Sequence, residues 1–319
     1  MKILANDGIS SEGIEKLEAA GFTVVTEHVQ QDKLIDTINN ENYVGLLVRS
    51  ATTVRKDLID ACPGLKFIGR GGVGMDNIDV AYAREKGITV ENTPAASSQS
   101  VAELAMGSLF ALARSTYDSY KEMSSKDGAD FKVLKKKYSA GVELRGKTLL
   151  IIGFGRIGQS LASYALGAGM KVIGVTQTAR AIDIPLNIEG IGEIISTIQS
   201  TTDLDEALGK ADFITMNVPK TLDGKAIIGK AQFAKMKDGV RIVNVARGGV
   251  IDEDDLLEAL NSGKVAAAAL DVYENEPSPR TDLLQHSVIA NTPHIGAATS
   301  EAQARIGTEL ADKIIEAIK

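Results

Sequence analysis

The stretch that decides the fold is residues 146–162, GKTLLIIGFGRIGQSLA. A short apolar run rich in β-forming residues, 148–152, leads into Gly153, Gly155 and Gly158, spaced as G-x-G-x-x-G, and apolar residues at helical spacing follow. This order predicts a strand, a tight turn and a helix. The first glycine permits the turn, the second lets a pyrophosphate approach bare backbone, and the third allows close packing of helix on strand. Because the N–H groups at the helix start then face the anion, the stretch predicts a dinucleotide site.

The surrounding sequence decides whether this motif is more than an ordinary turn. Glycines also gather in turns that bind nothing, so G-x-G-x-x-G alone is weak evidence. Here a second buried-strand pattern, residues 170–175, follows the helix and closes a strand–helix–strand unit of the size that dinucleotide binding requires. We therefore favour the dinucleotide interpretation over a turn without a ligand.

Length and composition are typical of a two-domain α/β protein. A chain of 319 residues is too long for one ordinary core and suggests two domains. Its hydrophobic content of 44% and charged content of 24% match a globular chain, while 31 glycines and 4% aromatic residues suit tight turns between aliphatic strands and helices.

The charge balance limits the classes of partner. A formal net charge of −7 argues against nucleic acid or an anionic membrane as the main partner, although small anionic substrates remain possible. The single cysteine, Cys62, allows no internal disulfide, and no apolar run reaches transmembrane length. We expect a cytoplasmic protein without a metal site.

Strands and helices alternate along the whole chain, which predicts parallel sheets. In the first part, strands are expected at residues 2–5, 23–26, 44–48, 66–68 and 88–90, with helices at 11–20, 32–40 and 57–61. A long helix, 101–112, then marks a domain boundary, and a lysine-rich segment, 132–137, is expected as a solvated loop. Beyond the glycine motif, strands are expected at 212–216, 241–244, 265–270 and 288–290, and the last helix, 301–318, is expected to pack back on the first domain.

Few residues could carry acid/base chemistry. Of three histidines, His28 and His286 lie where surface or packing roles are expected, whereas His294 directly follows a predicted strand of the nucleotide domain. Arg247 and Glu276 follow two other strands, and ligand groups gather at such strand exits in α/β sheets. An arginine there can hold a carboxylate through paired hydrogen bonds, and a carboxylate beside an imidazole fixes its tautomer. The three residues together predict an acid/base site.

Several stretches, in this order and spacing, resemble the D-isomer-specific 2-hydroxyacid dehydrogenases: GFGRIG (153–158), NVARGGVID (244–252), ALDVY (269–273) with Glu276-Pro277, and PHIGA (293–297). VRSAT (48–52) and GRGGVGMDNID (69–79) further resemble the substrate domain of D-3-phosphoglycerate dehydrogenases. The resemblance covers nearly the whole chain. We therefore expect an α/β fold with two doubly wound parallel-sheet domains. We further expect a Rossmann dinucleotide-binding domain (97–296) to be inserted into a flavodoxin-like substrate-binding domain (1–96 and 297–319).

The resemblance implies a role for each matching residue. His294 would exchange a proton with the 2-hydroxyl, Glu276 would orient His294, and Arg247 would hold the substrate carboxylate and polarise the 2-keto group. A nicotinamide would carry the hydride. Cofactor contacts would come from Gly153, Gly155, Arg156, Ile157, Gly158, Thr176, Asn217, Val218, Pro219, Ala246 and Asp271. Substrate contacts would come from the Val73 and Gly74 backbone, with Arg49, Arg70 and Lys135 as candidates for a phosphate.

The resemblance also implies a homodimer built on the long helix from Val101, and oxidation of 3-phosphoglycerate to 3-phosphohydroxypyruvate, a step of serine biosynthesis. Two alternatives stay open: reduction of glyoxylate or hydroxypyruvate on the same scaffold, and a non-catalytic, nucleotide-sensing interaction protein. The chain departs from the family pattern at Thr176, which stands where an acidic residue is expected to hold the adenosine ribose. NAD is therefore expected, with NADP possible. Because the sequence ends at Lys319, feedback by serine through a C-terminal regulatory domain is not expected.

Overall fold

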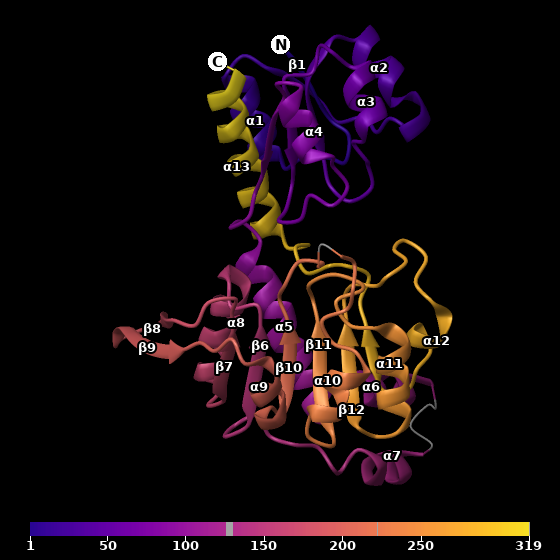
Figure 1. Cartoon of the computed structure of the whole chain (residues 1–319), viewed down its shortest axis with the longest axis vertical. Helices are drawn as coiled ribbons and strands as arrows, with labels where there is room; N and C mark the ends of the chain where they lie inside the picture. The colour runs from indigo at the N-terminus through magenta and orange to yellow at the C-terminus, as the bar shows by residue number, and fades with distance from the viewer. Residues whose placement is uncertain (126–129, 222, 319) are drawn as a thin grey trace. The chain divides into compact units, whose positions relative to one another are not determined.

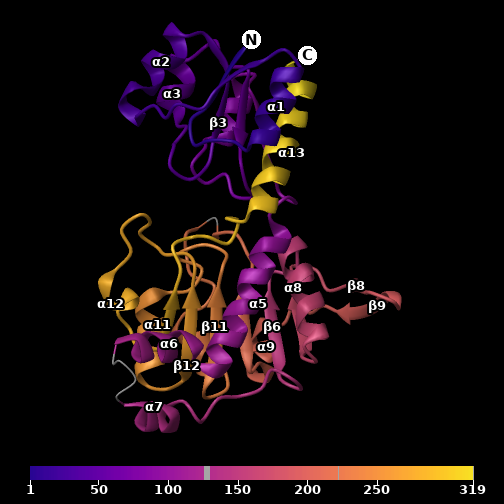
Figure 2. The same cartoon turned by 180° about the vertical axis from the view of Figure 1, so that it is seen from behind.

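The computed structural model describes residues 1–125, 130–221 and 223–318. The chain divides into two compact units: unit 1 comprises Met1–Ser100 with Ala297–Lys319, and unit 2 comprises Val101–Gly296 (Figures 1 and 2). Lys319, the last residue of the expected substrate-binding domain, lies outside the described residues.

Unit 1 is built on a five-stranded parallel sheet in the order β2-β1-β3-β4-β5, the doubly wound flavodoxin-like arrangement. Its strands are β1 (Lys2–Ala5), β2 (Thr23–Val25), β3 (Tyr43–Val48), β4 (Phe67–Arg70) and β5 (Thr89–Asn92). Its helices are α1 (Ser11–Ala19), the 3₁₀ turn η1 (Gln31–Lys33), α2 (Leu34–Asn40), α3 (Lys56–Ala61), α4 (Val80–Glu85) and α13 (Ser300–Ile318).

Both faces of the unit 1 sheet are covered. Alternate strand residues point to opposite faces: Leu4 and Leu46 pack with α2, α3 and α4, whereas Ile3 and Leu47 pack with α1 and α13. α13 therefore completes the core of unit 1, although its sequence follows that of unit 2. Buried aliphatic strands with helices on both sides are typical of a parallel sheet.

Unit 2 contains a six-stranded parallel sheet in the order β13-β12-β11-β10-β6-β7. Its strands are β6 (Thr148–Ile152), β7 (Lys171–Val175), β10 (Phe213–Met216), β11 (Val240–Asn244), β12 (Val265–Leu270) and β13 (Ile289–Asn291). Its helices are α5 (Ser98–Arg114), which begins just before the boundary, α6 (Thr116–Ser125), α7 (Phe131–Lys137), α8 (Arg156–Gly167), α9 (Leu204–Lys210), α10 (Lys230–Lys235), α11 (Glu253–Asn261) and α12 (Thr281–Leu284).

The helices of unit 2 also cover both faces of its sheet. Residues of α5 and α8 pack on one face and residues of α9, α10 and α11 on the other (Figures 1 and 2). The chain moves from β6 outward to β7 and then returns to β10 on the other side of β6. Such a reversal of strand order creates a crevice at the carboxyl ends of the two central strands, here β6 and β10. The expected α/β fold with two doubly wound sheets is confirmed.

One region of unit 2 differs from the expectation. The stretch after β7, for which no strand was expected, forms an antiparallel hairpin of β8 (Ala181–Ile188) and β9 (Gly192–Gln199). Alternating apolar residues explain it, because Ile182, Ile184 and Ile198 point to one face and join the core beside α8. The position beside β7 where a third Rossmann strand usually pairs is reduced to one bridge, between Val175 and Thr201.

The lysine-rich segment 132–137 is also different from the expected loop, because it forms the short helix α7 with Leu134 buried. Within the described parts of the chain, no helix combines the length and the apolar character needed to cross a bilayer.

Candidate active site

The glycine turn after β6 has the geometry that its spacing predicts. At Gly153, φ is +93°, and a Cβ would lie 2.4 Å from the Asn217 carbonyl oxygen. At Gly158, a Cβ would lie 2.5 Å from the Gly153 carbonyl oxygen. Gly155, at the N-cap of α8, has nothing within 4 Å of its Cβ position. The outer two glycines are thus required by close packing, whereas Gly155 opens the first turn of α8 to an incoming anion.

The other expected cofactor residues lie at the same edge of the unit 2 sheet. Arg156 and Ile157 open α8, Asn217, Val218 and Pro219 directly follow β10, and Ala246 follows β11. The side-chain oxygen Oδ1 of Asn217 is buried and has no hydrogen-bond partner within the described residues. A buried acceptor without a partner beside Gly153 is suited to a hydroxyl group of a bound ligand.

The end of β7 is closed by hydroxyl groups. Thr176 Oγ1 donates to the Thr178 carbonyl oxygen at 2.8 Å and lies 3.0 Å from Ser200 Oγ. The backbone of Arg180 is tied to the same Ser200 hydroxyl, and its side chain is exposed. Asp183 lies in the hairpin and accepts a hydrogen bond from Thr197. The turn 176–180 therefore contains no carboxylate.

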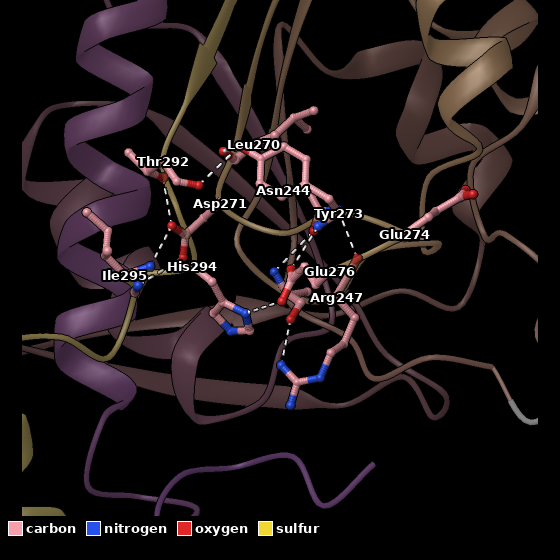
Figure 3. Close-up of polar contacts among 12 residues, drawn as sticks. Asn244, Arg247, Leu270, Asp271, Tyr273, Glu274, Glu276, Thr292, His294 and Ile295 are labelled. Atoms are coloured by element: carbon pink, nitrogen blue, oxygen red, sulfur yellow. Dashed lines mark hydrogen bonds and ion pairs between the residues drawn. The ribbon is translucent and has the colours of Figure 1, made fainter. Parts of the chain in front are cut away.

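Arg247, Glu276 and His294 follow β11, β12 and β13, three neighbouring strands of unit 2. His294 Nδ1 lies 2.8 Å from Glu276 Oε2. Glu276 Oε1 accepts a hydrogen bond from the Tyr273 N–H at 2.9 Å. Figure 3 shows Arg247 on the side of Glu276 away from Asp271, with its guanidinium donating to the Ala246 carbonyl oxygen. The structure thus brings the three expected catalytic residues together.

The electrostatics of Glu276 favour its charged form. Burial alone would raise its pKa, but the hydrogen bonds from His294 and the Tyr273 N–H, with the charges of His294 and Arg247, outweigh burial and hold the pKa of Glu276 below its ordinary value. A carboxylate that stays ionised accepts a proton-bearing Nδ1 and leaves Nε2 of His294 for other partners.

Asp271, which is expected to contact the nicotinamide, also binds a neighbouring loop of the protein. Its carboxylate accepts hydrogen bonds from Thr292 Oγ1 at 2.6 Å, from the Ile295 N–H at 2.8 Å and from the Gly296 N–H at 2.9 Å (Figure 3). Asp271 therefore holds the loop that carries His294. The sequence pattern alone gave no indication of this contact.

Two further positioning residues near Arg247 were missed from the sequence. Asn244 is buried and binds both the Ala246 N–H and the Arg247 carbonyl oxygen through its side chain. Gly248 has no room for a side chain, since a Cβ would lie 1.8 Å from the Tyr273 carbonyl oxygen. The two glycines after Arg247 were the available signal, but the partner that approaches Gly248 could not be named from the sequence.

The expected substrate residues of unit 1 gather around one glycine loop. Arg49 directly follows β3 and Arg70 ends β4. A Cβ on Gly71 would lie 3.6 Å from Arg49 Cγ, and a Cβ on Gly72 would lie 1.9 Å from Arg70 Nη1. Both arginines therefore border the loop that continues into Val73 and Gly74.

Lys135 is placed differently. It is exposed on α7, which follows α6 and leads toward the start of β6. α7 therefore lies at the edge of the unit 2 sheet where the strands begin, opposite to the exits that carry His294 (Figures 1 and 2). Within unit 2 the structure therefore does not place Lys135 beside His294: twelve residues, 136–147, separate it from β6, which begins at the same edge as α7.

A glycine turn for a dinucleotide and a histidine–carboxylate pair on the same sheet edge are features of a nicotinamide-dependent dehydrogenase. Residues 106–296 match the family described as D-isomer specific 2-hydroxyacid dehydrogenase, NAD binding domain. The chain belongs to the D-isomer specific 2-hydroxyacid dehydrogenase family and is an oxidoreductase that uses a nicotinamide cofactor.

Named relatives support the same family. The chain is 44% identical to a hydroxypyruvate reductase of Thermotoga maritima over 319 residues, 99% of this chain and 97% of the relative. It is 42% identical to a D-3-phosphoglycerate dehydrogenase of Methanocaldococcus jannaschii over 320 residues, but spans only 58% of that relative. A solved glyoxylate reductase of Paecilomyes thermophila superimposes with a TM-score of 0.81 at 30% identity, covering 99% of this chain and 95% of that one.

Proposed function

We propose that the protein transfers a hydride between a nicotinamide cofactor and a D-2-hydroxy acid, with His294 as the acid/base. The observation that carries this proposal is the 2.8 Å contact between His294 Nδ1 and Glu276 Oε2 at the sheet edge that also bears the glycine turn. When bound, the nicotinamide supplies or accepts the hydride. The protein must then move one proton and hold one carboxylate.

The proton is assigned to Nε2 of His294. A carboxylate can only accept hydrogen bonds, so the contact with Glu276 assigns a proton to Nδ1 and leaves the Nε2 lone pair for the 2-hydroxyl of the substrate. In the oxidation direction, Nε2 removes the proton from the 2-hydroxyl oxygen while the hydride leaves C2. The imidazolium that forms is stabilised by ionised Glu276. In the reduction direction, the imidazolium returns that proton.

Arg247 is assigned to the substrate carboxylate and the 2-keto oxygen. Its planar guanidinium can bind a carboxylate through two parallel hydrogen bonds, and its charge stabilises negative charge that develops on the keto oxygen. Backbone N–H groups of Val73 and Gly74 are assigned to the substrate carboxylate as well, since a glycine-rich loop can present them without side-chain obstruction.

We propose 3-phosphoglycerate as the preferred substrate, because Arg49 and Arg70 border one glycine loop in unit 1 and offer a phosphate two charge-assisted donors. Hydroxypyruvate is the second candidate. It is favoured by the T. maritima relative, which this chain matches over 97% of its length, and by the position of Lys135 away from His294.

For the cofactor we propose NAD with weak discrimination against NADP. A carboxylate after β7 would repel a 2′-phosphate, but the turn 176–180 contains only hydroxyl, amide and guanidinium groups. Thr176 can accept one hydrogen bond from a ribose hydroxyl, and the exposed Arg180 can attract the phosphate. Neither residue excludes NADP.

We propose a homodimer that uses the α5–α6 surface of unit 2. Phe110, Tyr117 and Tyr120 are 50%, 43% and 75% exposed, and a hollow of about 300 Å³ on this surface is lined by Gly107, Ser108 and Ala111. Exposed aromatic side chains are enriched at protein–protein interfaces, and a two-fold contact pairs the same surface of two subunits. A monomeric mass in solution would contradict the dimer without affecting the proposed chemistry.

The substrate assignment is tested by steady-state reduction of 3-phosphohydroxypyruvate, hydroxypyruvate and glyoxylate, followed by the absorbance of the reduced cofactor. The phosphate assignment predicts the highest kcat/KM for 3-phosphohydroxypyruvate. A higher value for hydroxypyruvate would favour the second candidate and leave the roles of His294, Glu276 and Arg247 intact.

A further inference from the structure

The loop that carries His294 has an uncommon backbone conformation. His294 itself has φ +54°, in the left-handed region that residues other than glycine seldom occupy. Such a conformation persists at a functional site only where neighbouring groups fix the backbone on both sides of it. The contacts of the loop, 292–296, therefore decide where the imidazole points.

Asp271 fixes the side of the loop that follows His294. Its carboxylate accepts hydrogen bonds from the Ile295 and Gly296 N–H groups and from the Thr292 hydroxyl. These contacts do not involve the Thr292 carbonyl oxygen, which precedes Pro293 and His294 in the loop.

The Tyr273 side chain fixes the side that precedes His294. Its hydroxyl oxygen lies 3.1 Å from the Thr292 carbonyl oxygen, 3.0 Å from that of Leu270 and 3.1 Å from Asn291 Oδ1. The residue is 6% exposed. Burial, followed by the charge of Asp271, raises the pKa of Tyr273 to about 12, so the hydroxyl keeps its proton and acts as the donor among these three acceptors.

The same residue also holds the partner of His294. The Tyr273 N–H donates to Glu276 Oε1 at 2.9 Å, while Glu276 Oε2 receives His294 Nδ1 at 2.8 Å (Figure 3). One residue thus binds the carboxylate through its backbone and the histidine loop through its hydroxyl. The contacts form a closed ring from the Tyr273 hydroxyl through Thr292 and His294 to Glu276 and back to the Tyr273 N–H.

We propose that the Tyr273 hydroxyl is a positioning group, which holds the His294 imidazole against Glu276 and thereby helps to set the pH range of the reaction. This inference rests on the proposed function, in which His294 moves the proton. The charged and titratable groups around the ring are Asp271 and Glu276 after β12, Arg247 after β11, and the neighbouring Tyr117 on α6. None of them changes when the Tyr273 hydroxyl alone is removed.

The competing explanation is that the hydroxyl only satisfies buried carbonyl groups. In that case its removal lowers stability but leaves the relation between His294 and Glu276 unchanged. The two explanations therefore differ in the pH profile and in the tautomer of His294, and agree in predicting some loss of stability.

Tyr273→Phe separates the two explanations, because phenylalanine keeps the buried ring and the N–H that binds Glu276. We expect the acidic limb of kcat/KM for oxidation to move to lower pH, in the direction expected for Glu276→Gln but by less. We expect kcat to fall about tenfold through misplacement of the imidazole, with the Kd of the cofactor unchanged. Tyr82→Phe is the matched control, since the Tyr82 hydroxyl binds Asp60 in unit 1. It should leave the pH profile as in the wild type.

A second readout does not depend on turnover. Nitrogen NMR of labelled histidine reports which ring nitrogen carries the proton, and His28 and His286 serve as internal references. We expect His294 to change from the Nδ1–H tautomer to a mixture of both tautomers in Tyr273→Phe, while the two reference histidines keep their signals.

The double variant Tyr273→Phe/Glu276→Gln completes the test. If the hydroxyl acts through Glu276, the double variant has the same acidic limb as Glu276→Gln. An unmoved limb and an unchanged tautomer in Tyr273→Phe would overturn the inference, whether or not kcat or stability falls. His294→Ala in the same assay distinguishes failure of the proposed function from failure of the inference. If this variant stays active, the proposed function fails and the inference fails with it. If His294→Ala is inactive and Tyr273→Phe keeps its limb and tautomer, only the inference fails.

Discussion

Gly153 and Gly155 are two residues apart, and substitution by alanine is expected to lower stability at the first and cofactor affinity at the second. In Gly153→Ala, the new methyl group would lie 2.4 Å from the Asn217 carbonyl oxygen and 2.6 Å from Val218 Cγ1, at φ +93°. Backbone strain of this kind costs about 1–3 kcal/mol. Together with the shift needed to relieve the contact, we expect a total of about 2–4 kcal/mol, at the upper end of ordinary single substitutions.

In Gly155→Ala, the methyl group enters open space, and the backbone, at φ −83°, suits any residue. The loss of a glycine N-cap costs less than about 1 kcal/mol. The methyl group instead occupies the place where the pyrophosphate approaches α8. We expect the Kd of the cofactor to rise at least about tenfold, equivalent to about 1.4 kcal/mol.

The assay compares thermal unfolding with cofactor titration by fluorescence or calorimetry for both variants. For a unit of this size, about 3 kcal/mol corresponds to a fall in Tm of about 6–12 °C, expected for Gly153→Ala alone. Gly155→Ala should keep most of its Tm and lose cofactor affinity. A Gly153→Ala protein with wild-type Tm, or a Gly155→Ala protein with wild-type cofactor affinity, would refute the assigned roles of these glycines.

The remaining predictions concern the proposed chemistry. His294→Ala should lower kcat by about 10²–10⁴-fold, with little change in the Kd of the cofactor by titration; a few-fold loss would remove His294 from its role. Glu276→Gln should move the acidic limb of the pH–rate profile to lower pH, since it removes the charge that stabilises the imidazolium. The pKa of Glu276 is depressed in the folded protein, so its contribution to stability is present above the unfolded pKa and is lost as pH falls through the folded one. Denaturant titrations should accordingly show a smaller loss of stability on acidification for Glu276→Gln than for the wild type. Arg49→Ala should raise KM for 3-phosphoglycerate far more than KM for glyoxylate, and equal effects would argue against phosphate recognition. Arg180→Ala should lower kcat/KM with NADP and spare NAD, whereas a wild-type preference for NAD of several hundred-fold would mean that another group repels the 2′-phosphate.

Local patterns in the sequence were sufficient for much of the fold. The apolar runs at residues 2–5 and 265–270 coincide with β1 and β12, because buried strands of parallel sheets are continuous aliphatic segments. The spacing of the glycines also predicted the turn after β6, where Gly153 has a positive φ and Gly158 packs against the Gly153 carbonyl oxygen. The family resemblance then led us to expect one domain inserted into the other.

Elements with mixed patterns were harder to predict. The hairpin of β8 and β9 has a buried root, at Ile184, but exposed isoleucines further along, at Ile188 and Ile194, so its apolar alternation does not correspond to burial along its length. Helix α7 contains four lysines and one buried leucine, and a charge run of this kind is also typical of a loop.

In the candidate site, too, some residues could be predicted from the sequence and others could not. Arg247, Glu276 and His294 could be named because each follows a predicted strand, and strand exits of one parallel sheet lie at one edge. The residues that position them could not be named, because their contacts join distant segments: Tyr273 reaches Thr292, and Gly248 approaches the backbone of Tyr273. Lys135 was a candidate for the phosphate through the family resemblance, and its place on α7 could not be predicted from its charge.

The most direct test of the central claim is turnover with a single 2-keto acid, resolved by product configuration. Purified protein is mixed with reduced cofactor and 3-phosphohydroxypyruvate or hydroxypyruvate, and the product is analysed by chiral chromatography. We predict consumption of the cofactor in equal amount to formation of the D-2-hydroxy acid, and its absence in His294→Ala. A folded protein that binds the cofactor but forms no hydroxy acid from any 2-keto acid, or forms the L enantiomer, would contradict the assignment. The first of these results would instead favour a nucleotide-sensing interaction protein.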